Sequence, residues 1–378
     1  MRVVHVMKSD PAVYGMQRVL LTELVQQRAR GLDARYLVLH EKRMGREADK
    51  MSTLCEAQKI PVIKVPVSGR FSVPEVLAVR RAIEAAGADV VHAHGYKGDF
   101  FSLFAARLAR VPVVGEVHGW LFPNPREQPL IRFYEWLDAQ VLKRMDCAIA
   151  LSEHYRQMLL GMGFDAERLR LVPSGIDAEE VRNRGKGGDL RAQLGIPPDC
   201  PTVGVLSRLS HEKGVDLFLE AMAHVVRAHP EVRVVVFGTG PLEVGLKALG
   251  EWLGLSKHLT WAGYVSAAAD ALRTLDVVAQ TSRIEALPQV LMEAMILERP
   301  TVVTPVGGCP ELVQDGETGF VSPGHDPRQI AAAVNRLLDD PELARRMGQA
   351  GRRRIEEDYS MDRWFERTLS VYRELARA

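Results

Sequence analysis

Two glutamates eight positions apart, Glu285 and Glu293, flank Pro288 in the second half of the chain. Proline is favoured in the first turn of a helix, so we expect Glu285 in the preceding loop and Glu293 inside the helix. Backbone amides at a helix start bind anions, and a carboxylate on each side of the turn can accept hydrogen bonds from sugar hydroxyls. Charged side chains are common at helix ends. The pair taken alone is therefore also explained by an ordinary capped helix start that faces solvent and binds no ligand.

Two cations follow an apolar run in a second motif, where Arg208 and Lys213 come after residues 202–206. At the carboxyl end of a strand they could clamp a diphosphate, arginine as a fork and lysine as a point charge. A solvated loop is the alternative interpretation. In a third motif, Gly238 and Gly240 follow another apolar run, which lets the backbone pass close to a ligand or to a neighbouring segment.

Apolar runs typical of strands alternate with helix-length segments through the whole chain. The strand-like runs are residues 3–7, 35–39, 60–65, 89–92, 111–117 and 146–151, then 202–206, 232–237, 276–279 and 301–304. The helix-length segments are residues 15–30, 73–86, 97–109 and 126–145, then 214–228, 241–253, 288–297 and 326–339, with a last helix at about 361–376. This alternation predicts βαβ units and two doubly wound α/β domains, which bind ligands at the carboxyl ends of their strands.

Composition excludes several classes of protein. The 378 residues carry 49 Lys and Arg against 48 Asp and Glu, a balance that argues against a general nucleic-acid binder. No stretch approaches the roughly 18 continuous apolar residues of a membrane span, and the first residues lack the pattern of a signal peptide, so we expect a cytoplasmic protein. Four cysteines without a CxxC pair fit a reducing compartment, namely Cys55, Cys147, Cys200 and Cys309.

The near-neutral total hides a separation of charge. Residues 1–173 carry 25 Lys and Arg against 19 Asp and Glu, net +6, whereas residues 174–378 carry 24 against 29, net −5. Within the basic part, segment 126–145 has apolar residues at helical spacing with basic residues among them. Core packing or a basic, membrane-touching helix explains this segment. Its apolar residues are Leu130, Tyr134, Leu137, Val141 and Met145, preceded by Trp120, Leu121 and Phe122.

Taken jointly and in this order, the motifs resemble those of the family 4 retaining glycosyltransferases, which have the GT-B fold. The resemblance rests on Ser207-Arg208-Leu209 with Glu212-Lys213-Gly214, on Gly238 with Gly240-Pro241, on Glu285 with Glu293, and on Gly307-Gly308 with Glu311, Gly316 and Gly319. It covers nearly the whole chain. It implies two Rossmann-like domains facing each other across a cleft. Residues 1–173, with the final helix 361–378 packing back on them, would form the acceptor side, and residues 174–360 the donor side.

The resemblance also assigns roles to residues of the donor side. Arg208 and Lys213 would hold the diphosphate of the donor, and Glu293 would bind the ribose of its nucleotide. Glu285, together with the backbone amides around Ala286 and Leu287, would hold the donor sugar and phosphate. The Gly238–Gly240 turn would approach the nucleotide, and the segment ending at Val265 would lie beside the base.

In the first domain, the resemblance implies that Gly15 approaches the diphosphate and that His118 lies near the reacting sugar. Arg208, Lys213, Glu285 and His118 are the expected catalytic groups, and domain closure is expected to bring them together. The chain departs from the family pattern at three positions. Tyr14 stands where a second glycine is usual, Ala286 where glycine is frequent, and Ser174 where asparagine is common.

The implied reaction is transfer of a sugar from a nucleotide-diphosphate sugar to a hydroxyl acceptor, with retention at the anomeric carbon. No cofactor or metal ion is expected, a UDP-sugar is favoured over a GDP-sugar, and the acceptor is a glycan or lipid-linked saccharide of a bacterial cell surface. A nucleotide-sugar epimerase and a non-catalytic nucleotide-sugar-binding subunit remain as alternatives. An oxidoreductase is disfavoured because no GxGxxG follows the first strand.

Two further features have structural interpretations. His92 and His94 form an HxH pattern near a strand end, and alternate strand residues share a face, so a metal pair is conceivable. Since no carboxylate or cysteine companion is evident, we expect structural histidines. The tract of Arg352, Arg353 and Arg354 is expected to form a solvated helix face. The net charge of the first domain suits an anionic acceptor or the inner face of the cell membrane.

Overall fold

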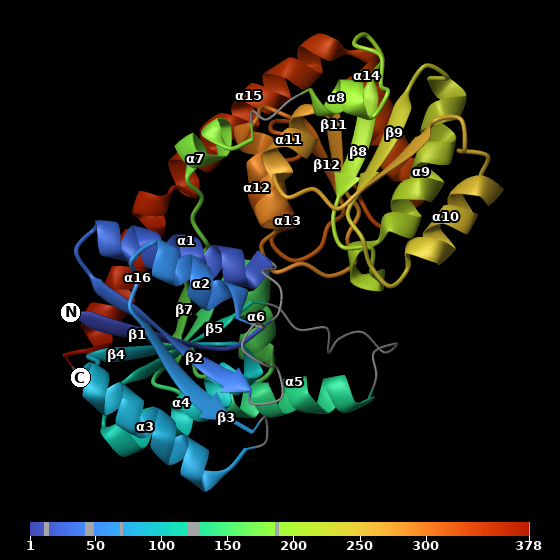
Figure 1. Ribbon diagram of the computed structural model, residues 1–378. Coiled ribbons are helices and arrows are strands. Elements are labelled where there is room, and N and C mark those ends of the chain that lie inside the picture. The colour runs from blue at the N-terminus through green and yellow to red at the C-terminus, as the bar shows by residue number, and fades with distance from the viewer. Residues whose placement is uncertain (11–14, 42–48, 69–70, 119–128, 186–188, 378) are drawn as a thin grey trace. The chain divides into compact units, whose positions relative to one another are not determined.

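A computed structural model describes residues 1–10, 15–41, 49–68, 71–118, 129–185 and 189–377 (Figure 1). The chain divides into two compact units. Unit 1 comprises Met1–Ser174 and Met361–Ala378, and unit 2 comprises Gly175–Ser360. The boundary predicted from the sequence lies after residue 173, one residue earlier. Both units contain a parallel sheet with helices, so the predicted α/β class is confirmed.

Unit 1 contains a seven-stranded parallel sheet in the order β3-β2-β1-β4-β5-β6-β7. Helices α1, α2 and α16 lie on one side of it, and α3, α4 and α5 lie on the other (Figure 1). Its strands are β1 Arg2–Lys8, β2 Asp33–Glu41, β3 Val62–Val67, β4 Val90–His94, β5 Val113–Val117, β6 Cys147–Ala150 and β7 Leu169–Leu171. Its helices are α1 Gly15–Ala29, α2 Lys50–Ala57, α3 Val73–Ala86, α4 Gly95–Ala109, α5 Pro129–Leu142, α6 Glu153–Gly161 and α16 Met361–Leu375.

Unit 2 contains a six-stranded parallel sheet in the order β10-β9-β8-β11-β12-β13. Its strands are β8 Thr202–Leu206, β9 Arg233–Phe237, β10 Leu259–Gly263, β11 Val277–Gln280, β12 Thr301–Val303 and β13 Phe320–Val321. Its helices are α7 Ala178–Asn183, α8 Leu190–Gln193, α9 Val215–Ala228, α10 Glu243–Trp252, α11 Ala268–Arg273, α12 Gln289–Ile296, α13 Cys309–Leu312, α14 Pro327–Asp339 and α15 Pro341–Asp358. The central strands are near-continuous apolar runs because helices cover both faces of the sheet.

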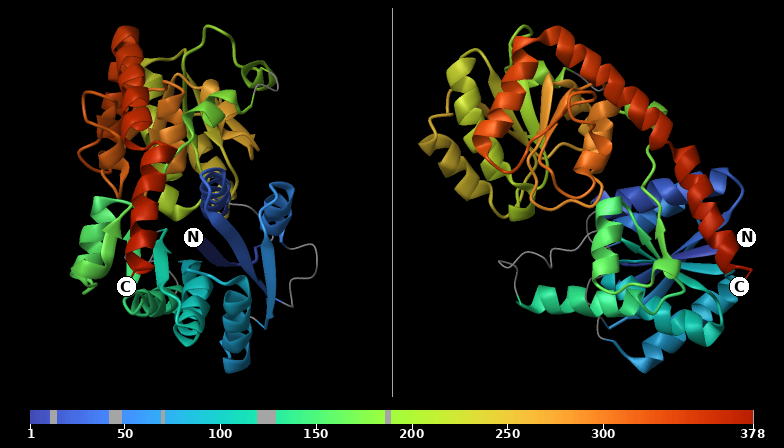
Figure 2. Two further views of the ribbon diagram at one scale, coloured as in Figure 1. Left: turned by 90° about the vertical axis from the view of Figure 1, so that its left-hand side faces the viewer. Right: turned by 180° about the vertical axis from the view of Figure 1, so that it is seen from behind.

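The last helix, α16, belongs to unit 1 although it follows unit 2 in the sequence (Figure 2). Trp364 and Tyr372 are buried on its inner face. The Tyr372 hydroxyl lies 2.7 Å from His92 Nδ1 of β4 and accepts a hydrogen bond of 3.3 Å from Gln27 Nε2 of α1. At the ends of the helix, Arg30 pairs with Asp362 and Arg170 with Glu374.

The arginine tract in α15 differs from its prediction. Only Arg353 is exposed. Arg352 forms ion pairs with Glu298 at 2.9 Å and with Glu356 at 3.0 Å. Arg354 donates to the backbone carbonyl of Leu312 at 2.9 Å and thereby ties the end of α13 to α15. The prediction of a solvated face was wrong because two of the three arginines satisfy groups distant in sequence.

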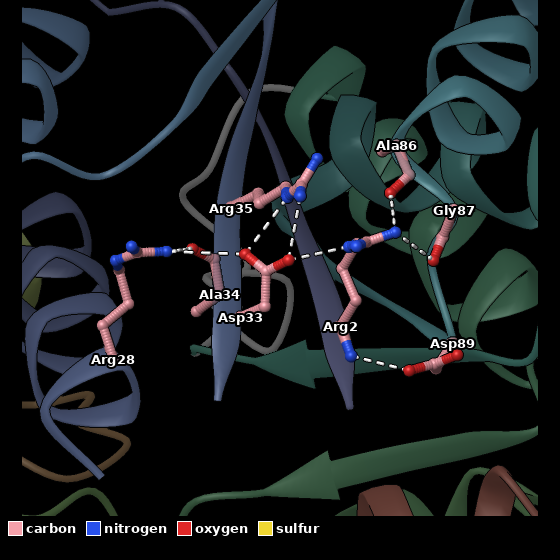
Figure 3. Close-up of polar contacts among 8 residues, drawn as sticks. All are labelled: Arg2, Arg28, Asp33, Ala34, Arg35, Ala86, Gly87 and Asp89. Atoms are coloured by element: carbon pink, nitrogen blue, oxygen red, sulfur yellow. Dashed lines mark hydrogen bonds and ion pairs between the residues drawn. The ribbon is translucent and has the colours of Figure 1, made fainter. Parts of the chain in front are cut away.

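Asp33 is the centre of a charged network at the amino ends of β1 and β2 (Figure 3). Its carboxylate accepts hydrogen bonds from Arg2 Nε at 2.7 Å and from Arg35 Nη2 at 2.8 Å. Arg2 also donates to the carbonyl oxygen of Ala86 at 2.8 Å, and its backbone amide donates to Asp89 at 2.7 Å. The network therefore ties β1 and β2 to the end of α3 and the start of β4.

Replacing Asp33 with asparagine is expected to destabilise the protein at pH 7 and to matter less in acid. The Arg35 and Arg2 guanidinium groups lower the pKa of Asp33 to about 2. The stabilisation is therefore complete above the unfolded pKa of about 3.9 and is lost as the pH falls toward about 2. Because the side chain is 35% exposed, solvent screening reduces it to about 1 kcal/mol. The melting temperatures of wild type and Asp33→Asn, measured from pH 7 to pH 2, should converge. A constant difference would contradict this explanation, and Asp165→Asn, in an exposed pair with Arg168, is the control.

Candidate functional site

Three hydrogen-bond donors converge on one carboxylate oxygen in unit 2. Glu285 Oε1 lies 2.7 Å from Gln280 Nε2, 2.7 Å from Ser282 Oγ and 2.8 Å from Lys213 Nζ. Gln280 ends β11, and Ser282 and Glu285 lie in the loop between β11 and α12. The carboxylate is only 7% exposed, so this network fixes its position rather than leaving it as a mobile surface charge.

Lys213 reaches Glu285 from the loop that follows β8. Strands β8 and β11 are neighbours at the point where the strand order of the sheet reverses, and ligands of open α/β sheets bind outside the strand ends at such a point. Burial works against the charge of Lys213, but its attraction and hydrogen bond to Glu285 outweigh burial and raise the pKa of the lysine. The side chain is therefore a cation at neutral pH and remains 27% exposed.

Gly214 and Gly307 pack closely against the backbone of the loop that carries Glu285. A Cβ on Gly307 would overlap the carbonyl oxygen of Glu285, and a Cβ on Gly214 would overlap that of Thr281. Both glycines have positive φ, at +52° and +61°. The amide of Gly308 donates to the Ala286 carbonyl at 2.8 Å. This close approach of backbones requires the absence of a side chain, which explains why glycines occupy these positions.

The segment after Glu285 leads into α12. Ala286 and Leu287 are buried, at 8% and 7% exposure. Pro288 is the N-cap of α12 rather than a residue of its first turn, and the helix begins at Gln289. Glu293 lies inside α12 as predicted, and its Oε1 is 3.8 Å from Arg184 Nη1. The two glutamates therefore lie on either side of a helix start, in the arrangement expected from their spacing.

Arg208 is exposed at the end of β8, and its loop packs on the turn containing Gly238 and Gly240. A Cβ on Gly238 would overlap the Ser207 carbonyl oxygen, and one on Gly240 would overlap that of Leu209. The neighbouring segment thus accounts for both glycines. Their expected contact with a nucleotide remains a prediction.

Beyond the Gly238 turn, the segment expected beside the base follows β10. The Gly238 amide donates to the carbonyl of Gly263 at 2.7 Å. The Val265 side chain packs on an apolar cluster of unit 2, whereas Tyr264 is 65% exposed. The segment therefore offers one exposed ring next to the Gly238 turn.

A bidentate ion pair that was not predicted from the sequence connects the same loops. Arg283 Nη1 and Nη2 each lie 2.7 Å from a carboxylate oxygen of Asp216, and the Arg283 amide donates to the Glu212 carbonyl at 2.8 Å. Burial opposes ionisation of Asp216, but the Arg283 guanidinium lowers its pKa. The pair connects the loop before Glu285 to the segment around Lys213. No local spacing marks it, because the partners are 67 positions apart.

The predicted site residues of unit 1 lie near carboxyl ends of strands. Gly15 is the first residue of α1 and is exposed, whereas Tyr14 lies outside the described residues. His118 directly follows β5, and its side chain is 15% exposed. Its Nε2 is 3.2 Å from Nδ1 of His94, and its Nδ1 is 3.8 Å from Oε1 of Glu116. Burial raises the pKa of Glu116.

The histidines of the HxH pattern have companions that the sequence did not reveal. His92 Nε2 is 3.4 Å from the buried Glu116, and burial lowers the pKa of His92 to about 3. Within the described residues, two groups have ligand atoms close enough for a metal ion. They are His5 with His92 and His94, and His94 with Glu116 and His118. The expectation that no carboxylate accompanies His92 and His94 was wrong. The pairing of neighbouring strands brings a glutamate that is distant in sequence beside these histidines.

Within segment 126–145, the described residues pack into the core only in part, and membrane contact by this segment remains a prediction. Val141 and Met145 are buried, as core packing predicts. Tyr134, assigned to the same apolar stripe, is 40% exposed, and Phe133 and Trp136 beside it are 53% and 51% exposed. Trp120, Leu121, Phe122 and the Leu130 side chain lie outside the described residues. In the described part of the chain, no helix is long and apolar enough to cross a membrane.

Comparison with known proteins extends over both units. A family model described as "Glycosyl transferases group 1" matches residues 188–354, and one described as "Glycosyl transferase 4-like domain" matches residues 14–175. An alpha-D-kanosaminyltransferase of Streptomyces kanamyceticus is 27% identical over 383 residues, covering 94% of this chain and 99% of the relative. A D-inositol 3-phosphate glycosyltransferase of Kineococcus radiotolerans is 31% identical over 313 residues, covering 75% of this chain and 71% of the relative.

The fold has counterparts among solved structures. HepE of Anabaena, in complex with UDP and glucose, superposes with a TM-score of 0.83 at 22% identity, covering 99% of this chain and 100% of the other. The sucrose-phosphate synthase of Thermosynechococcus elongatus superposes with a TM-score of 0.81 at 20% identity. The GT-B fold expected from the motifs is therefore confirmed.

Proposed function

The chain belongs to the group 1 glycosyltransferases, and we propose that it transfers a sugar from a nucleotide-diphosphate sugar to a hydroxyl acceptor, retains the anomeric configuration and needs no metal ion. The observation that carries the proposal is the Lys213–Glu285 pair at the reversal point of the unit 2 sheet. A lysine held as a cation beside a fixed carboxylate suits a ligand that has both a diphosphate and sugar hydroxyls.

In the proposed reaction, negative charge develops on the diphosphate as it leaves the sugar. Lys213, Arg208 and backbone amides at the start of α12 would stabilise that charge, which is the work a metal ion performs in other phosphate chemistry. Glu285 would hold hydroxyls of the donor sugar. The departing phosphate oxygen would accept the proton of the acceptor hydroxyl on the same face of the sugar, so the configuration is retained. His118 would orient the sugar.

UDP-sugars are the favoured donors, with GDP-sugars next. The UDP complexes of HepE support this order, because that protein has the same fold and its UDP-glucose complex contains a donor of this class. A glycan or lipid-linked saccharide of a bacterial cell surface is the proposed acceptor. The basic charge of residues 1–173, net +6, suits an anionic acceptor of this kind.

The proposal is tested by incubating the protein with UDP-, GDP- and ADP-sugars, with and without a bacterial lipid extract, in buffer containing EDTA. We expect nucleoside diphosphate release from one donor class, increased by the extract, and a product whose anomeric proton coupling matches that of the donor. Inverted configuration or dependence on added metal would contradict the mechanism. Conversion of the donor sugar to an epimer without an acceptor would favour the epimerase, and binding without release across all acceptors would favour a non-catalytic subunit.

Contact with the cytoplasmic face of the membrane is a further part of the proposal. Phe133 and Trp136 of α5 stack with ring centroids 6.0 Å apart and are both half exposed, beside the exposed Arg132. Exposed aromatic rings next to basic side chains are typical of surfaces that bind anionic lipids.

Replacing both Phe133 and Trp136 with serine is expected to reduce co-sedimentation with vesicles containing anionic lipid by at least severalfold. The physical reason is the loss of apolar area that inserts between lipid headgroups. Trp252→Ser removes an 81% exposed tryptophan from unit 2 and is the matched control. Binding that is indifferent to the double substitution, or to the anionic lipid content, would refute this membrane contact.

A further inference from the structure

A row of buried histidines crosses the sheet of unit 1 and ends at His118. Sheet register pairs His5 of β1 with His92 of β4, and His94 of β4 with Glu116 of β5. Register partners on neighbouring parallel strands, and alternate residues of one strand, point to the same face of a sheet. The pairing therefore gathers these side chains on one face, which is the face that carries α1 and α16.

Consecutive members of this row lie at hydrogen-bond distance. His5 Nε2 is 2.9 Å from Gln27 Oε1 of α1, and His5 Nδ1 is 3.0 Å from His94 Nε2. His94 Nδ1 is 3.2 Å from His118 Nε2. At the far end, Gln27 Nε2 donates to the Tyr372 hydroxyl of α16. One chain of hydrogen bonds thus connects α16 and α1 to the predicted sugar-binding histidine. We call Gln27, His5, His94 and His118 the histidine relay.

Burial keeps the imidazoles of the relay neutral. His5 and His94 are 0% and 1% exposed. Loss of hydration lowers the pKa of both well below its usual value, and burial also lowers the pKa of His118. A neutral imidazole has one N–H donor and one acceptor nitrogen. Each hydrogen bond between two rings of the relay needs one protonated and one unprotonated nitrogen. The position of the hydrogen atom at one end of the relay therefore determines which nitrogen is protonated in every ring.

The Gln27 amide sets the direction of the relay. Its Nε2 donates to Tyr372, so its Oε1 accepts from His5 Nε2–H. His5 Nδ1 then has no proton and accepts from His94 Nε2–H. His94 Nδ1 in turn accepts from His118 Nε2–H. His118 consequently has its proton on Nε2 and its lone pair on Nδ1, which at 3.8 Å from Glu116 is too distant for a hydrogen bond to that carboxyl.

We propose that Gln27, His5 and His94 are positioning residues that hold His118 as the neutral Nε2–H tautomer, which leaves Nδ1 as the nitrogen that can accept a hydrogen bond from a hydroxyl of the reacting sugar. The identity of that hydroxyl rests on the proposed function, whereas the tautomer does not. His118 then acts as a neutral acceptor that orients the donor sugar, not as an imidazolium. The relay also makes α1 and α16 part of the support for a residue at the end of β5.

A metal ion bound by His5, His92 and His94 is the competing use of the same nitrogens. Their ligand atoms lie within 4.8 Å of one another. Nitrogen ligands 2.0–2.1 Å from a tetrahedral zinc ion are about 3.3 Å apart. His5 Nδ1 and His94 Nε2 are closer, at 3.0 Å, which is the separation of a hydrogen bond. Direct hydrogen bonding therefore describes the pair better, and metal binding is an outcome that the test distinguishes.

Nitrogen-15 NMR of the full chain with labelled histidine tests the tautomer directly. The chain has 11 histidines, and comparison with His118→Asn identifies the signals of His118. At pH 7 we expect His118 to show a protonated Nε2 and an unprotonated Nδ1. In Gln27→Met this pattern should give way to a mixture of tautomers, whereas Gln26→Met, the same change one position earlier in α1, should leave it unchanged. Gln27→Glu retains an acceptor for His5 and should preserve the pattern.

Three results would overturn the relay. They are a proton on Nδ1 of His118, a His118 spectrum insensitive to Gln27→Met in a folded protein, and shifts of the His5, His92 and His94 ring nitrogens on addition of Zn²⁺. If Gln27→Met does not fold, Gln27→Glu and the wild-type tautomer still decide the outcome. In the transfer assay, Gln27→Met should lower kcat about tenfold, as loss of an outer hydrogen-bond partner does elsewhere, with less change in the donor KM and recovery in Gln27→Glu. A protein without transferase activity would refute the proposed function while the tautomer result stood.

Discussion

Lys213→Ala is expected to lower the turnover of the donor by about a thousandfold and to leave the protein folded. The lysine is the cation closest to Glu285, with 2.8 Å between Nζ and Oε1, and it lies where the proposed diphosphate leaves. Removing one fixed charge that stabilises a developing anion typically costs 10²–10³ in kcat, and this lysine also orients the carboxylate proposed to bind the sugar. Glu285→Ala is expected to abolish transfer for the second reason.

The fold should survive the loss of Lys213 because the network has other members, and the loop that carries Glu285 is also held by the hydrogen bond from the Gly308 amide to the Ala286 carbonyl. Without Lys213, Gln280 and Ser282 still donate to Glu285. The matched control is Lys247→Ala, which removes an ion pair of the same length, 2.8 Å to Glu243, from the surface of α10. We expect near-wild-type turnover in this control. Turnover in Lys213→Ala or Glu285→Ala within tenfold of wild type, with circular dichroism unchanged, would refute the assignment.

Gly307→Ala is expected to cause the largest loss of stability among single methyl additions near the site. A Cβ at this position would overlap the Glu285 carbonyl oxygen, and φ is +52°. Overpacking costs about 1–3 kcal/mol and the left-handed conformation about 1–2 kcal/mol more. For a unit of this size, about 3 kcal/mol lowers the melting temperature by about 6–12 °C. Since the Glu285 backbone must move, donor binding should also weaken.

Gly316→Ala separates the two causes of that loss. Its φ is +78°, but no atom lies within 4 Å of the added Cβ. It therefore carries the conformational cost of about 1–2 kcal/mol without the overlap and should lower the melting temperature by about 2–8 °C, less than Gly307→Ala does. Differential scanning calorimetry of the two variants measures the difference. Equal melting temperatures would show that the Glu285 loop moves at little cost in free energy and that Gly307 does not determine its position.

The sequence predicted those features of unit 2 that depend on local order. Strand, loop and helix signals predicted that Lys213 follows β8 and that Glu285 precedes α12, and the order of motifs identified the family. The donors Gln280 and Ser282 were missed because neither has a distinctive pattern. The Arg283–Asp216 pair was missed because its partners are distant in sequence.

In unit 1, contacts between residues distant in sequence again escaped prediction. The HxH pattern of His92 and His94 was recognised, but His5 and Glu116 join it only through sheet register, which periodicity does not reveal. The helical stripe at residues 126–145 predicted burial of Tyr134 and Val141 alike, yet only the latter meets the core. Sequence spacing shows which residues share one face of a helix. How much of that face is buried depends on the elements that pack against it, and spacing does not show those.

Titration of the protein with the donor found in the release screen tests the central claim most directly. With EDTA present, calorimetry should detect binding to wild type and to Lys247→Ala, and a loss of affinity of at least tenfold in Lys213→Ala. That result would establish that a cation of the protein, rather than a metal ion, holds the diphosphate. Equal affinity in Lys213→Ala and wild type, or binding only after a divalent metal is added, would contradict the proposed function of the Lys213–Glu285 site.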